Sequence, residues 1–87
     1  MDTNVNKQTT LARMSSGRTG TVVQIAGGHN LTQRLQALGI RPGKRITKVS
    51  AMFGRGPATV QVDNTQIAIG FGMAGKIIVE VDKSNTR

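Results

Sequence analysis

The sequence has 87 residues, enough for one domain with a thin core. It has no Cys, one His, and 12 Lys or Arg residues against four Asp or Glu residues, for a net charge of +8. This composition excludes a disulfide framework, a cysteine-based zinc site and a thiol nucleophile, and it favours acidic partners. No apolar run approaches the ~20 residues of a membrane span, and a small domain without disulfides is compatible with the cytosol.

Three parts of the chain are expected. Residues 1–9 are polar and show no periodicity, which predicts a flexible N-terminal arm. Residues 10–82 carry the apolar patterns and are predicted to form one domain. Residues 83–87 form a polar tail.

The first predicted strand covers residues 19–25. It is rich in β-branched residues, and Thr21, Val23 and Ile25 alternate along it. Such alternation places these three side chains on one face.

A short helix is predicted over residues 31–38. Leu31, Leu35 and Leu38 recur at i, i+4 and i+7, which places them on one face toward the core. Asn30 is predicted to cap the N-terminus of this helix.

A turn and a second strand are predicted next. Gly39 and Gly43 can take the positive φ that a helix end and a tight turn require, and Pro42 fixes φ at the preceding position of the turn. In the strand over residues 44–52, Ile46 and Val49 break strict alternation, which predicts a bulge.

Three further strands are predicted in the last third of the domain. Residues 58–62, 66–69 and 76–81 alternate in the β pattern. Residues 63–65 are expected to form a hairpin turn, and residues 70–75 a corner. The whole pattern predicts a mainly β protein: a small barrel of about five antiparallel strands with one short α-helix, whose closure removes exposed edges.

Several segments resemble one known family. They are Gly17-Arg18-Thr19-Gly20-Thr21-Val22, the run from Arg34-Leu35 to Leu38-Gly39-Ile40-Arg41-Pro42-Gly43, and the later Gly56-Pro57 and Ile77-Ile78-Val79. Together they resemble the FeoA family over roughly residues 11–81. The resemblance implies an SH3-like barrel in the cytoplasm that serves bacterial ferrous iron uptake. It also implies that the protein docks on the cytoplasmic part of the FeoB membrane GTPase-permease.

Signals for catalysis and cofactors are weak. Gly70, Gly72 and Gly75 spell a dinucleotide-binding fingerprint, but a strand is predicted where that fingerprint needs a helix. His29 and the scattered carboxylates show no metal-ligand spacing. We therefore expect no enzyme activity, no cofactor and no metal site.

The predicted contact surface for a protein partner comprises the helix, the turn after it and the following strand and loop. Its residues are Gln33, Arg34, Arg41, Lys44, Arg45, Lys48, Phe53 and Arg55.

The alternative function is binding of nucleic acid or another acidic partner. It is motivated by the charge and by the lack of any acidic residue from Thr3 to Val62. However, Phe53 and Phe71 are the only aromatic residues, a poor platform for stacked bases and a poor groove for proline-rich peptides.

Overall fold

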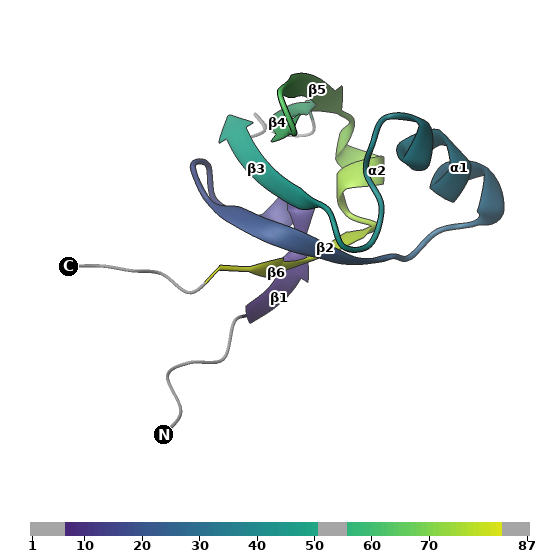
Figure 1. Cartoon of the computed structure of the whole chain (residues 1–87), viewed down its shortest axis with the longest axis horizontal. Coiled ribbons are helices and arrows are strands. Elements are labelled where there is room, and N and C mark those ends of the chain that lie inside the picture. The colour runs from purple at the N-terminus through teal and green to yellow at the C-terminus, as the bar shows by residue number, and fades with distance from the viewer. Residues whose placement is uncertain (1–6, 51–55, 83–87) are drawn as a thin grey trace.

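The computed structural model describes residues 7–50 and 56–82, which form one curved antiparallel sheet flanked by short helices (Figure 1). The elements are β1 (Lys7–Thr10), the 3₁₀ helix η1 (Leu11–Arg13), β2 (Thr19–Ile25), α1 (His29–Ala37), β3 (Arg45–Ser50), β4 (Ala58–Val62), β5 (Thr65–Ile69), α2 (Phe71–Ala74) and β6 (Ile77–Val81). In the described part the strands follow the order β1-β6-β2-β3-β4-β5. The predicted mainly β fold is confirmed, with six strands there instead of about five.

The additional strand is β1. Its residues pair with β6 in a continuous register from Lys7 opposite Val81 to Thr10 opposite Ile78. The prediction of a flexible arm is therefore wrong for residues 7–9. Backbone pairing holds this segment at the edge of the sheet, and such pairing permits any side chain. The segment therefore needs no apolar alternation, and the sequence pattern does not reveal the strand. Residues 1–6 and 83–87 lie outside the described residues.

Strand β2 presents a different face from the one predicted. Val22 is buried, whereas Thr21 and Val23 are only half-buried. The register with β6 shifts between Val22 and Gln24, so a bulge breaks the alternation, and Ile25 also packs against the core. An unbroken period of two could not have predicted both contacts.

β2 and β6 also approach each other very closely. A Cβ atom on Gly20 would lie 2.6 Å from the carbonyl oxygen of Glu80 and 2.6 Å from a methyl of Val79. Only glycine permits this contact.

Helix α1 begins two residues earlier than predicted. Gly28 is its N-cap and no side chain caps it, so Asn30 lies inside the helix and the predicted cap is wrong. Leu35 is fully buried and Leu31 packs against the core, as predicted. Leu38, however, is 45% exposed.

The end of α1 explains the exposure of Leu38. Gly39 has a φ of 90°, which turns the chain. The Gly39 N–H donates to the Gln36 carbonyl at 2.9 Å, and the Ile40 N–H donates to the Leu35 carbonyl at 2.9 Å. These two bonds form a Schellman motif, which brings Ile40 into the core in place of Leu38.

The remaining strands agree with the sequence pattern. The register between β3 and β4 shifts between Lys48 and Ser50, which confirms the predicted bulge. β4 and β5 form a hairpin across Asp63 and Asn64, and Asp63 has a φ of 57°. Thr65, predicted as part of this turn, is the first residue of β5.

The core lies inside the curve of the sheet. Strands β4 and β6 each bury alternate residues, and η1 and α2 contribute buried side chains between them. Within the part of the chain that the structure describes, β1 and β5 are the two edges of the sheet and do not pair with each other. The predicted closure by strand pairing is therefore absent there, and η1 packs instead against β6 and α2.

Lys48 is the largest fully buried side chain, with only 2% of its surface exposed. Its ammonium nitrogen, Nζ, donates to the carbonyl oxygens of Leu11 at 3.0 Å, Ala12 at 3.2 Å and Met14 at 2.7 Å. Burial lowers the pKa of Lys48, while these three carbonyls stabilise its charged form. Val49, the next residue along β3, is exposed.

We predict that Leu35→Ala lowers the free energy of unfolding by ~2–5 kcal/mol, because it leaves a cavity in the core. Leu38→Ala is the matched control on the same helix and is expected to change it by less than ~0.5 kcal/mol. Urea unfolding followed by circular dichroism measures both. Equal losses would contradict the burial described above.

Lys48→Met is predicted to lower the free energy of unfolding by ~1–3 kcal/mol, because three carbonyls lose their donor while the volume of the side chain is kept. Lys44→Met is the control, and it should cost at most ~1 kcal/mol because Lys44 forms only an exposed ion pair. Thermal unfolding of the two variants tests this. A Lys48→Met variant as stable as wild type would show that the ammonium is dispensable.

Candidate protein-docking surface

The eight residues predicted to contact a partner are not equivalent in the structure. One is buried, two form ion pairs, three are exposed, and two lie outside the described residues. They are, in that order, Lys48; Lys44 and Arg45; Gln33, Arg34 and Arg41; and Phe53 and Arg55.

The prediction that Lys48 contacts a partner is wrong. Its ammonium is held by the η1 segment inside the protein. The β3–β4 bulge follows it directly, and Lys48 lies two residues from Ile46 on the core-facing side of β3. A lysine in a strand usually points to solvent, so the sequence carried no sign of this arrangement.

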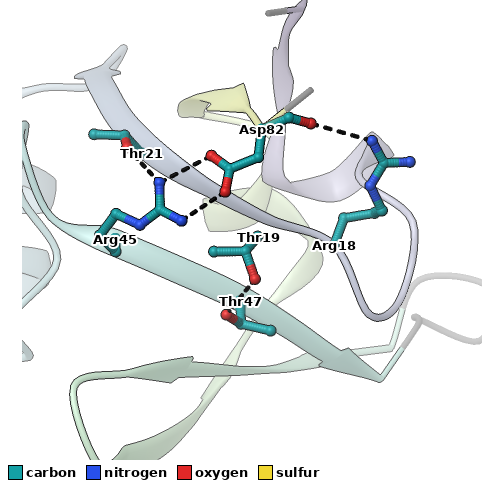
Figure 2. Close-up of polar contacts among 6 residues, drawn as sticks. All are labelled: Arg18, Thr19, Thr21, Arg45, Thr47 and Asp82. Atoms are coloured by element: carbon teal, nitrogen blue, oxygen red, sulfur yellow. Dashed lines mark hydrogen bonds and ion pairs between the residues drawn. The ribbon is translucent and has the colours of Figure 1, made fainter. Parts of the chain in front are cut away.

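Lys44 and Arg45 are each engaged by an acidic residue of the chain. Lys44 Nζ lies 2.9 Å from Asp63 Oδ2 at the β4–β5 hairpin. Arg45 donates to both carboxylate oxygens of Asp82, from Nη1 to Oδ1 at 2.9 Å and from Nη2 to Oδ2 at 2.6 Å (Figure 2). Two cations of the predicted surface are therefore already paired with carboxylates of the chain itself.

The Arg45–Asp82 pair affects both partners. The hydrogen bonds from Arg45 lower the pKa of Asp82, and the nearby charge of Arg18 acts in the same direction. The same contact raises the pKa of Arg45. Both side chains stay accessible, at 59% for Arg45 and 42% for Asp82.

Gln33, Arg34 and Arg41 point to solvent. Gln33 and Arg34 lie on α1, and Arg41 lies in the turn that follows it. Among the residues that the structure describes, no hydrogen bond or ion pair engages either arginine side chain. The exposed Leu38 lies four residues after Arg34, on the same side of the helix. We define these residues, Gln33, Arg34, Leu38 and Arg41, as the α1 surface.

Sequence reasoning missed Leu38 because the leucine stripe predicts a core position. Leu38 is exposed instead of buried because Gly39, the next residue, ends the helix. The Leu-Gly pair was a usable signal, because the residue before a left-handed glycine leaves the helical path.

The remaining candidate groups are scattered. In residues 7–50 and 56–82, no three His, Asp or Glu side chains come together as metal ligands.

The Gly70–Gly75 segment forms the single turn of α2 and then leads into β6, so the strand predicted after the glycine fingerprint is confirmed. None of the described helices is long and apolar enough to span a bilayer.

The stability that the Arg45–Asp82 pair contributes is predicted to depend on pH. The folded state lowers the pKa of Asp82, so the contribution is complete above about pH 5, begins to fall near the ordinary aspartate pKa of about 4, and is lost as the pH falls further through the lowered pKa of the folded state. Near neutral pH, the free energy of unfolding of wild type should exceed that of Asp82→Asn by at most ~1 kcal/mol, because the pair is exposed. Melting temperatures across this range measure the difference. A gap that stays constant down to the lowest pH would contradict the prediction.

The comparisons with known proteins agree with the geometry. The model of the FeoA domain family matches residues 9–81. A crystal structure of an iron uptake regulatory protein (FeoA) is 36% identical, with a TM-score of 0.81, and the alignment covers 86% of this chain and 99% of that one. No curated protein matches the sequence.

Two further structures share the fold at lower identity. FeoA of Stenotrophomonas maltophilia in complex with zinc, described as a prokaryotic SH3 domain protein, is 23% identical with a TM-score of 0.72, over 85% of this chain and 95% of that one. A manganese-dependent transcriptional repressor is 22% identical with a TM-score of 0.79, over 86% of this chain but only 42% of that one. The family match over nearly the whole domain and the 36% identity together show that this chain belongs to the FeoA family, which is linked to ferrous iron transport.

Proposed function

We propose that this chain is a non-catalytic accessory protein of bacterial ferrous iron uptake. It acts in the cytoplasm by docking on the cytoplasmic part of the FeoB permease. Membership in the FeoA family supports the link to iron transport.

The observation that carries the docking proposal is the α1 surface. Arg34 and Arg41 are exposed and have no partner among the described residues, whereas Lys44 and Arg45 in the same region are each paired with a carboxylate. An arginine offers a planar fork of donors that matches a carboxylate, and it loses less hydration than a lysine when it is covered. Arginines are accordingly enriched where proteins contact each other.

The exposed Leu38 adds apolar area to the α1 surface. A large apolar side chain at 45% exposure gains free energy when a partner covers it. α1 has no acidic residue in its first turn, and Arg34 stands in its last turn. A partner that meets this surface is therefore expected to present carboxylates around an apolar contact.

The structure weakens the case for nucleic acid. One cation of the predicted surface is buried and two are paired with carboxylates, so fewer of its cations are free for phosphates than the sequence indicated. Phe71 is the only aromatic residue in the described part of the chain. We therefore treat nucleic-acid binding as an outcome to be tested.

A pull-down with the cytoplasmic part of FeoB tests the proposal. Arg34→Glu combined with Arg41→Glu should reduce recovery at least tenfold, because two attractive contacts become repulsive. Lys7→Glu combined with Arg13→Glu is the matched control, since it reverses two exposed cations on β1 and η1 and should leave recovery close to wild type.

Equal recovery of wild type and the α1 variant would remove the α1 surface from the interaction. Reduced recovery of FeoB with both variants would show that the interaction depends only on net charge. Failure of wild-type protein to recover FeoB, together with tight binding of a duplex oligonucleotide, would replace the proposal with the nucleic-acid alternative.

A further inference from the structure

Asp82 lies between two arginines that come from distant parts of the chain. Arg45 at the start of β3 holds its carboxylate through two hydrogen bonds of 2.9 and 2.6 Å. Arg18, in the turn before β2, donates from Nη2 to the Asp82 carbonyl oxygen at 3.3 Å. Figure 2 shows both guanidinium groups directed at Asp82 from opposite sides.

The guanidinium of Arg45 is oriented as in a binding site. Its Nη1 also donates to the Thr21 hydroxyl at 3.3 Å, which fixes the plane of the fork. Parallel donation to both oxygens of one carboxylate is the geometry by which arginine recognises acidic ligands. Because Arg45 is 59% exposed, this oriented donor can be reached from solvent.

The Asp82 side chain can leave without disturbing the sheet. Its backbone N–H donates separately to the Thr19 carbonyl at 2.9 Å. The hydroxyls of Thr19 and Thr47 share a hydrogen bond of 2.7 Å, which joins β2 and β3 independently of the ion pair (Figure 2). Because both side chains are exposed, water and salt screen the ion pair, and another anion can compete for Arg45.

We propose that the Asp82 carboxylate is an internal competitor that occupies a binding site for an acidic peptide segment. A carboxylate of the partner replaces Asp82 on Arg45, and Arg18 supplies a second positive charge. The contact is autoinhibitory, because Asp82 must be displaced before the partner binds. This site belongs to β2, β3 and the end of β6, not to the α1 surface, and it holds or fails independently of docking on FeoB.

A carboxylate is favoured over a nucleic-acid phosphate on two grounds. The present occupant is itself a carboxylate in the planar two-oxygen arrangement. Phe71, the only Phe, Tyr or Trp in residues 7–50 and 56–82, belongs to α2 and not to the strands that form this site, so the site has no platform on which a base could stack.

The probe is a fluorescein-labelled hexaglutamate peptide, titrated by anisotropy at low ionic strength. Asp82→Asn should bind it about three- to fivefold more tightly than wild type, because the internal competitor is lost. Asp63→Asn is the matched control: it also removes one carboxylate from an exposed ion pair and raises the net charge equally, but it should leave the affinity close to wild type. Circular dichroism confirms that each variant is folded.

Two further variants complete the test. The double variant Asp82→Asn plus Arg45→Gln should not show the gain in peptide affinity that Asp82→Asn shows. Arg45→Gln alone should bind the peptide more weakly than wild type. Equal affinities of wild type and Asp82→Asn would overturn the proposal and leave a purely structural ion pair. Equal gains in Asp82→Asn and Asp63→Asn would also overturn it, since net charge alone would explain them. A gain for a single-stranded oligonucleotide but not for the peptide would overturn the choice of carboxylate.

Discussion

The ammonium of Lys48 joins the η1 segment to β3, in the middle of the sheet. Its three acceptors lie 34 to 37 residues earlier in the sequence, so one side chain closes a long loop. A domain of this size has a thin core, and a lone 3₁₀ turn adds little apolar area to it. With the carbonyls of η1 bound, Leu11 and Met14 become core residues, and β1 is directed along the edge of β6.

This use of a lysine changes how the charge of the protein should be understood. Lys48 serves the interior, Lys44 and Arg45 hold the two carboxylates at the hairpin and at the end of β6, and Arg34 and Arg41 are exposed with no partner among the described residues. The 12 basic residues of the sequence therefore do not form one uniform positive surface. The surface available for recognition is smaller and better defined than the composition indicates.

Much of the fold could be predicted from the sequence, because alternation and glycine-marked turns report directly on β4, β5 and β6. The failures have physical causes. β1 is held by backbone pairing, which leaves no side-chain pattern. The bulge in β2 moves Val22 into the core, and Gly39 turns Leu38 out of it. The docking surface was predicted less well, since the carbonyl partners of Lys48 and the carboxylate partner of Arg45 lie 34 or more residues away, and no local pattern encodes them.

The same fold occurs in a longer manganese-dependent repressor, so the fold alone does not determine a role. Recognition must then depend on surface side chains. SH3 domains that bind proline-rich peptides use aromatic grooves, whereas the described surface of this chain offers arginines around one exposed leucine. Contacts of that kind gain specificity and speed of association from charge, and they weaken as salt screens the charge. Asp82 occupies a separate site, where it is bound by Arg45 and Arg18, and a carboxylate held there competes for the same donors by the same chemistry as the proposed acidic peptide.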